Sequence, residues 1–203
     1  MKAPLLPSLF AAVLVLFTGA SARAEVAPGQ PAPDFTLQDS EGTPYTLSAQ
    51  KGHYVVLEWF NVECPFVRKH YDSGNMQALQ RTWRDRGAVW WSITSSAQGK
   101  QGSYAAAELE HKMRNAGSSA AAVLKDEDGM VGKAYGAKTT PHMFVIDPEG
   151  VLIYAGAIDD KPSVDKADVK GALNYVNQAL TEAMAGKPVS VSSVPSYGCS
   201  VKY

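Results

Sequence analysis

The chain has 203 residues, of which 45% are hydrophobic and 19% are charged, and its formal net charge is −1 at pH 7. This composition fits one globular domain with a sizeable core. Because the chain carries no block of Lys or Arg, the sequence argues against nucleic acid and anionic membrane surfaces as partners.

The first 24 residues have the pattern of a secretory signal peptide. Lys2 gives a basic start, residues 9–17 form an unbroken apolar stretch, and residues 22–24 are a small-x-small cleavage signal. We therefore expect cleavage before Glu25 and export to the periplasm or another extracytoplasmic space. An uncleaved membrane anchor is the alternative, but two prolines and the cleavage signal favour removal, which leaves no stable anchor and a net charge of −3.

The next part of the chain predicts a short β-hairpin and then a buried strand. A proline-rich lead-in over residues 25–33 precedes two short strands, 34–37 and 43–47, around a polar turn at 39–42. Residues 54–60 are a near-continuous apolar run, which is typical of a strand covered on both faces.

A long helical pattern and a second buried strand follow. The pattern over residues 65–86 predicts a helix with a weak point at 72–75, and residues 88–94 predict the strand. After a polar loop, Ser103 is a candidate cap for a helix that extends to about Asn115.

The last part of the chain predicts a late hairpin, a final helix and an extended tail. Residues 120–124 indicate a short strand and 130–135 a short helix, and residues 142–155 predict a β-hairpin. An apolar stripe over 169–184 predicts one final helix, and the tail covers 188–203.

This order of elements predicts a three-layer α/β fold with a mixed central sheet flanked by helices and an N-terminal β-hairpin extension. The expected organisation is a signal peptide over 1–24, one domain over 25–187 and a C-terminal tail over 188–203.

Cys64 is the strongest candidate for chemistry, because it follows a buried strand and precedes a helix. The unpaired N–H groups at a helix N-terminus favour a thiolate, which is the nucleophilic form of cysteine. Pro65 suits the first helical position, and the nearby cations Arg68, Lys69 and His70 are expected to lower the pKa of the thiol further. The alternative is a buried, inert cysteine, which the position at a strand-to-helix turn disfavours.

The chain resembles the peroxiredoxin-like branch of the thioredoxin superfamily, of the redoxin or AhpC/TSA type. The motifs that carry the resemblance are the lead-in over residues 29–37, the Cys-Pro-Phe of residues 64–66, the Ile-Asp-Asp of residues 158–160, and the Gly-Lys-Pro-Val and Gly-Cys-Ser-Val-Lys of residues 186–189 and 198–202. Together they cover about residues 28–203, and the resemblance implies a thioredoxin-like fold.

Two departures from the related families limit what the resemblance implies. Val67 stands where thioredoxins have the second cysteine of Cys-x-x-Cys, which excludes a two-cysteine cycle within the motif. Leu57 and Asn61 stand where peroxiredoxins have the proline and threonine that shape a peroxide pocket. Peroxidase activity is therefore disfavoured.

The resemblance also assigns roles to three residues outside the motif. Glu58 matches the buried acid that moves protons during exchange in thioredoxins, although an edge glutamate that reaches water is the alternative. Pro141 matches the cis-proline that faces the active-site cysteine, with an ordinary trans proline as the alternative. The backbone of Thr140 would then pair with an extended substrate.

Cys199 is the only other cysteine, 135 positions after Cys64. In an exported protein an even cysteine count suggests a disulfide. Cys199 on its Gly-flanked tail is a candidate resolving residue for Cys64, and a permanent structural disulfide is a close alternative. Free thiols or a bond between subunits remain open.

The sequence predicts no metal and no cofactor. His142 and Met143 could complete a soft copper site with Cys64, but a strand residue and core packing are the simpler interpretation.

These residues give one leading hypothesis and two rivals. The leading hypothesis is an exported thiol–disulfide oxidoreductase that acts on client protein or small-molecule thiols and disulfides and needs a reducing or oxidising partner. The rivals are a thiol peroxidase with an antioxidant role, and a non-enzymatic binding protein of redoxin fold with a structural Cys64–Cys199 disulfide.

Overall fold

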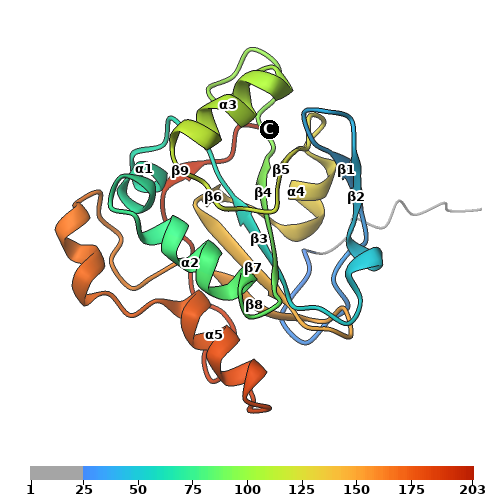
Figure 1. The fold of residues 1–203 in the computed structure, drawn as a ribbon, viewed down its shortest axis with the longest axis vertical. Coiled ribbons are helices and arrows are strands. Elements are labelled where there is room, and N and C mark those ends of the chain that lie inside the picture. Colours follow the sequence, from blue (N-terminus) through green and yellow to red (C-terminus); the bar gives the residue numbers. More distant parts are fainter. Residues whose placement is uncertain (1–24) are drawn as a thin grey trace, which may run out of the picture.

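The computed structural model describes residues 25–203, so the predicted signal peptide lies outside the described residues. A seven-stranded sheet with the order β2-β1-β5-β4-β3-β7-β8 forms the centre of the domain (Figure 1). Its strands are β1 (Thr36–Gln38), β2 (Pro44–Thr46), β3 (Val55–Trp59), β4 (Val89–Thr94), β5 (Ala122–Lys125), β7 (His142–Ile146) and β8 (Leu152–Gly156). A separate pair consists of β6 (Thr139–Thr140) and β9 (Cys199–Ser200).

The sheet is mixed, as the order of elements predicts. Strands β3, β4 and β5 run parallel, whereas β7 and β8 form the late antiparallel hairpin on one side. On the other side β1 and β2 form the N-terminal hairpin, which joins the sheet through an antiparallel pair with β5. The predicted hairpin extension is therefore confirmed.

Helices cover both faces of the sheet and complete the three layers (Figure 1). The α-helices are α1 (Pro65–Asp72), α2 (Asn75–Arg84), α3 (Ala106–Asn115), α4 (Met130–Tyr135) and α5 (Tyr175–Met184), and the 3-10 helices are η1 (Leu47–Gln50) and η2 (Lys166–Gly171). One core contains buried side chains of α1, α2, α3 and α5, and the other contains those of α4, η1 and the N-terminal segment. Among residues 25–203, no helix is long and apolar enough to cross a bilayer.

Strand β3 explains why its sequence is a continuous apolar run. Val56 and Phe60 belong to the core under α1, α2, α3 and α5, whereas Val55, Leu57 and Trp59 belong to the opposite core. Because successive side chains point to opposite faces of a sheet, a central strand needs apolar residues at nearly every position.

Two helix boundaries differ from the sequence predictions. The N-cap of α3 is Ala105, which makes no side-chain hydrogen bond, so the prediction of Ser103 as the cap is wrong. The Ser103 N–H instead donates to the Lys100 carbonyl in the preceding turn. The single helix predicted from the apolar stripe over 169–184 is divided into η2 and α5. The division arises because the Asn174 side chain caps α5 by accepting from the Asn177 N–H at 2.8 Å. Leu173, placed on the stripe by the sequence, is 50% exposed.

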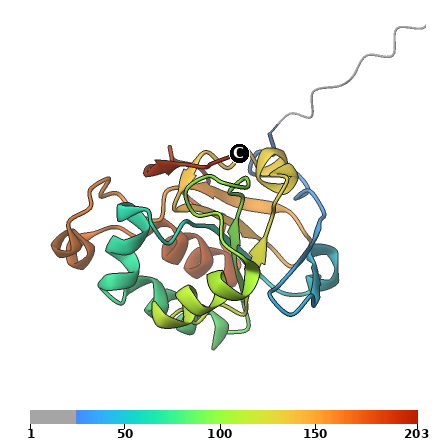
Figure 2. The ribbon, with the colours of Figure 1, turned by 90° about the horizontal axis from the view of Figure 1, so that it is seen from above.

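The C-terminal tail is docked along the domain rather than free. Its first part runs beside β8, where the Ala155 N–H donates to the Ser192 carbonyl and the Val194 N–H donates to the Ala155 carbonyl. Its last part forms β9 against β6. In Figure 2 the red C-terminal segment lies along one side of the domain, and its end is near α4.

Candidate functional site

Cys64 lies where the chain leaves β3 and enters α1. It is the N-cap residue of α1, Pro65 occupies the first helical turn, and the Cys64 carbonyl accepts from the Arg68 N–H at 2.9 Å. The Cys64 side chain is fully buried. The predicted placement of the thiol at a helix N-terminus is therefore confirmed.

The loop before β7 lies directly against this thiol. The Thr140–Pro141 peptide bond is cis, as the resemblance implies. The Cys64 Sγ donates to the Thr140 carbonyl oxygen at 3.0 Å. The structure therefore brings Cys64, Thr140 and Pro141 together.

The tail adds Cys199 to the same site. In the antiparallel pair of β6 and β9, Thr140 is directly opposite Cys199, and the Thr140 hydroxyl donates to the Cys199 carbonyl at 3.5 Å. Both cysteines are free thiols, and each is close enough to shift the pKa of the other. Of the described residues, Cys199 is thus the cysteine that faces Cys64.

The two thiols have opposite electrostatic environments. Burial opposes ionisation of Cys64, but its hydrogen-bonding environment, made by Cys199, Thr140 and Val67, outweighs burial and lowers the pKa of the Cys64 thiol. Burial and the neighbouring Cys64 raise the pKa of Cys199 to about 11. The thiolate is therefore favoured at Cys64 and disfavoured at Cys199.

Gly198 allows the tail to approach the cis-proline loop this closely. Its φ is +127°, and a Cβ atom there would overlap the Thr140 carbonyl oxygen. A side chain at this position would separate β9 from β6, so the glycine before Cys199 is a steric requirement of the site.

Arg68 and Lys69 do not act on the thiol as the sequence suggests. The Arg68 side chain is 64% exposed and pairs with Asp72 at 3.7 Å. Lys69 is buried, and its Nζ donates to the Lys161 carbonyl at 2.7 Å. The main groups that lower the pKa of Cys64 are hydrogen-bonding partners, and neither cation is among them.

Glu58 is fully buried in the middle of β3, as the resemblance implies. Its carboxylate accepts four hydrogen bonds, each of 2.8–3.1 Å, whose donors are Tyr71, Gln80, Trp90 and Ser92. Burial raises the pKa of Glu58, and the four donors only partly offset that effect. None of these hydrogen bonds leads to Cys64, so they offer no direct proton path from the thiol to Glu58.

We expect the Glu58→Gln variant to lose a pH dependence that the wild-type protein has. Because the pKa of Glu58 is raised on folding, the native state holds an extra proton above pH 4.5, and stability falls as pH rises through the folded pKa. The slope is at most about 1.4 kcal/mol per pH unit. Urea unfolding of both proteins between pH 4.5 and 9 measures the difference.

The exposed Glu41→Gln variant is the matched control for this experiment. Its unfolding free energy should follow the wild-type curve at every pH. If Glu58→Gln also runs parallel to the wild type, the Glu58 proton is not linked to folding.

Sequence reasoning misses a buried polar cluster beside the site. Its members are the buried Lys69, His70 and Asp159 and the half-buried Tyr197. The sequence assigns Lys69 to the thiolate and gives Tyr197 no role. The available signal is the Ile-Asp-Asp motif that contains Asp159, which the resemblance marks without giving it a role.

The described residues contain no group of three His, Cys, Asp or Glu side chains that could hold a metal ion. His142 is a core residue of β7: its ring lies 4.4 Å from that of Phe144, and burial lowers its pKa to about 4. Met143 is fully buried in the same strand.

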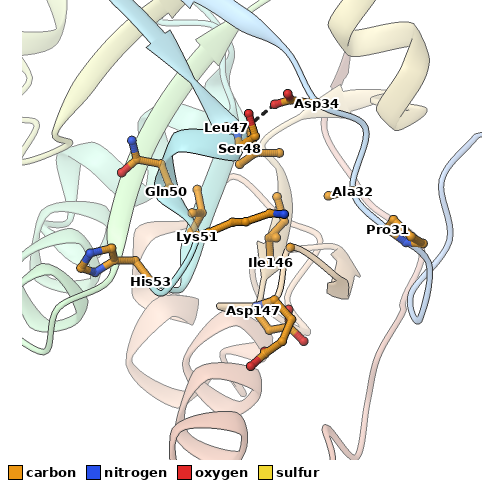
Figure 3. Close-up of a pocket in the computed structure, with 13 residues that line it drawn as sticks. Pro31, Ala32, Asp34, Leu47, Ser48, Gln50, Lys51, His53, Ile146 and Asp147 are labelled. Atoms are coloured by element: carbon orange, nitrogen blue, oxygen red, sulfur yellow. Dashed lines mark hydrogen bonds between the residues drawn. The ribbon is translucent and has the colours of Figure 1, made fainter.

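A pocket of about 230 Å³ lies at the opposite end of β3 from Cys64 (Figure 3). It lies beside Val55, the first residue of that strand, and Asp34, which accepts from the Ser48 N–H at 2.9 Å, lies on its wall. Cys64 follows the other end of β3, so this pocket is separate from the thiol site.

Solved structures share this fold over most of their length. A hypothetical protein from Sinorhizobium meliloti 1021 has 26% identity and a TM-score of 0.74, with 89% of this chain and 96% of that chain covered. An uncharacterized conserved protein from Geobacillus kaustophilus has 25% identity, a TM-score of 0.73 and coverages of 87% and 92%. A putative thiol:disulfide interchange protein DsbE from Chlorobium tepidum has 21% identity, a TM-score of 0.59 and coverages of 79% and 99%, which shows the fold alone.

No curated protein has significant sequence similarity to the chain. The family model of the AhpC/TSA family matches residues 28–155, which is more than half of the sequence and includes Cys64 and Pro141. With its thioredoxin-like fold, its cysteine at the start of α1 and the cis-proline opposite, the chain belongs to the AhpC/TSA family of redoxins in the thioredoxin superfamily.

Proposed function

We propose that the protein is an exported thiol–disulfide oxidoreductase in which Cys64 is the nucleophile and Cys199 is the resolving cysteine. The observation that carries the proposal is the register of β6 and β9, which puts Cys199 opposite Thr140 and beside the Cys64 thiol. The partner cysteine that Cys-x-x-Cys motifs keep within one turn of helix is supplied here by the tail.

The reaction uses two exchange steps. The Cys64 thiolate attacks one sulfur of a client disulfide, the client S–S bond breaks, and the other client sulfur leaves as a thiolate that takes up a proton. Cys199 then loses its proton and attacks the Cys64 sulfur, and the second client sulfur leaves and takes up that proton. The client gains two electrons and two protons, and the protein is left with a Cys64–Cys199 disulfide.

The same steps run in reverse when the client is a dithiol and the protein begins as the disulfide. A reducing or oxidising partner then restores the starting state. The opposed pKa shifts of the two thiols support the assignment of roles, because the thiol with the lower pKa attacks first and the other supplies the second proton.

Client access requires the tail to move. Cys64 is fully buried, and the Thr140 backbone that would pair with an extended client is already paired with β9. A client strand therefore competes with the tail for the same edge. Glu58 acts in this proposal by fixing α1 to β3, because the Tyr71 hydroxyl of α1 donates to its carboxylate at 2.8 Å.

Export is the second part of the proposal. It is supported by the apolar run over residues 9–17 and the cleavage signal at 22–24. An oxidising compartment would also allow the Cys64–Cys199 disulfide to persist between turnovers.

A redox titration of residues 25–203 with mass mapping of both cysteines tests the proposal. We expect an intramolecular Cys64–Cys199 disulfide that equilibrates with a glutathione buffer at a potential above about −300 mV. A disulfide below that value that does not exchange would show a static staple. No intramolecular disulfide at all would remove Cys199 from the reaction.

A further inference from the structure

A buried charged cluster lies behind the thiol site and holds the tail. Lys69 and His70 come from α1, Asp159 follows β8, and Tyr197 is in the tail. The side chains of Lys69, His70 and Asp159 are at most 1% exposed. The cluster thus joins three parts of the chain that are far apart in sequence.

Asp159 is the centre of the cluster. One of its oxygens accepts from the Tyr197 hydroxyl and from the Lys161 N–H at 3.0 Å. The other oxygen, Oδ2, is 3.6 Å from Lys69 Nζ and 3.9 Å from His70 Nε2, and it accepts no hydrogen bond from any described side chain. The Lys69 charge is thus paired with Asp159 and not with the Cys64 thiol.

Tyr197 is the only member of the cluster that belongs to the tail. Its hydroxyl also lies 3.2 Å from His70 Nε2, and its ring packs edge-on against Phe66 with centroids 5.8 Å apart. Lys69 Nζ lies 5.7 Å from the centre of the Tyr197 ring. The half-buried Tyr197 therefore contacts all three buried members of the cluster.

The positions in sequence connect this contact to the redox pair. Tyr197 comes two residues before Cys199, and Lys69 and His70 are on α1, the helix whose N-cap is Cys64. One rigid helix therefore fixes the nucleophile at its N-terminus and the anchor of the resolving cysteine near its other end. A buried ion pair adds little net stability but fixes geometry, which suits an anchor of this kind.

We propose that Tyr197 is a positioning residue, and that its bond to the buried Lys69–His70–Asp159 cluster is a latch that holds Cys199 against Cys64 and closes the client edge at Thr140. This inference rests on the proposed function, because it describes how that redox site is assembled and opened. When the latch opens, the tail leaves β6, Cys199 withdraws and a client strand gains the Thr140 backbone.

The Tyr197→Phe variant tests the latch, because it removes the hydroxyl and keeps the ring. In the reduced protein we expect alkylation of Cys199 by iodoacetamide to accelerate about tenfold, since a charge-assisted hydrogen bond holds the closed state. The equilibrium constant for disulfide formation against glutathione should fall by about the same factor, which corresponds to about 30 mV. In that reaction the two protein thiols give up two electrons and two protons to glutathione disulfide, which leaves as two glutathione molecules.

Tyr203→Phe is the matched control. The Tyr203 hydroxyl also holds the tail, but it donates to the neutral Ala137 carbonyl at 2.8 Å on the far side of Cys199. We expect less than about a threefold change from its loss, because a neutral hydrogen bond contributes less than a charge-assisted one. Equal acceleration in both variants, or none in Tyr197→Phe, would overturn the latch, because the tail would then be held by general docking.

Hydrogen exchange keeps the test valid if the variant is less stable. In Tyr197→Phe the amide of Val201, which donates to the Lys138 carbonyl at 3.0 Å, should exchange faster while the amide of Phe144 in β7 stays protected. Faster exchange at both amides would indicate global loosening and count against the latch. The alkylation readout needs no disulfide chemistry, so failure of the latch is distinguishable from failure of the proposed function.

Discussion

Replacing Cys64 by Ser is expected to reduce exchange with a client disulfide to the uncatalysed background, a loss on the order of 10³-fold or more. A hydroxyl at this position cannot form the thiolate that the first turn of α1, Thr140 and Cys199 stabilise. Replacing Cys199 by Ser should leave the first attack intact but stop resolution. A mixed disulfide on Cys64 should then accumulate to one per chain, which mass spectrometry of the quenched reaction measures.

The comparison of these two variants separates the redox interpretation from its rivals. Ser200→Ala is the control, because it changes an exposed residue of β9 and leaves both thiols. Full activity in Cys64→Ser would contradict the proposed function. Unchanged turnover in Cys199→Ser would show that another thiol resolves the intermediate.

A purely structural disulfide would give a different result. Closing a loop of about 135 residues is worth roughly 5 kcal/mol in the chain-entropy model, so both Ser variants would lose similar stability and neither would trap a client. The wild type would then be stable under oxidising conditions without exchange.

The sequence predicts well those features that depend on local order. The apolar run of β3, the helix start at Cys64 and the two hairpins follow from patterns that are local in the chain, and the structure has them all. The weak point at 72–75 becomes the Gly74 break between α1 and α2, because a glycine with φ +75° ends one helix and begins the next.

Contacts between distant segments account for what the sequence does not predict. Lys69 is five residues after Cys64, and this closeness in sequence suggests a shared site. In a helix, however, a spacing of five residues rotates the side chain by about 140° and places it more than one turn further along the axis. It meets Asp159 instead, 90 residues later. Nothing in a local pattern reveals that pair.

The tail illustrates the same limit. Its glycine-flanked cysteine suggests a mobile segment, yet the Ala97 N–H donates to the Lys202 carbonyl at 2.8 Å, and the Tyr203 ring lies over Gly132, where a Cβ atom would overlap it. A short polar tail becomes ordered when the surface below it offers matching backbone groups. That surface is assembled from separate loops, so only the fold reveals it.

Gly198→Ala is the second variant for which we expect a large effect. An alanine at φ +127° is strained by about 1–2 kcal/mol, and its methyl group would also overlap the Thr140 carbonyl oxygen. The pair of β6 and β9 should therefore separate, and Cys64, which is buried in the wild type, should react with a thiol reagent at least about tenfold faster. Stopped-flow measurement with a disulfide reagent on the reduced protein gives the rate.

Gly186→Ala controls for backbone strain alone, because Gly186 has φ +68° and a Cβ atom added there would meet no other atom within 4 Å. Equal rates in the two variants would contradict the close approach of Gly198 to Thr140.

The Gly198→Ala variant should affect attack by Cys64 and resolution by Cys199 in different ways. Without Cys199 beside it, the pKa of Cys64 should rise. The greater exposure of Cys64 should therefore speed its attack only at a pH where its thiolate still forms. Resolution by the displaced Cys199 should slow at every pH. If the tail both covers Cys64 and supplies the resolving Cys199, this one variant must show faster attack and slower resolution. If the tail only covers Cys64, attack should become faster and resolution should stay unchanged.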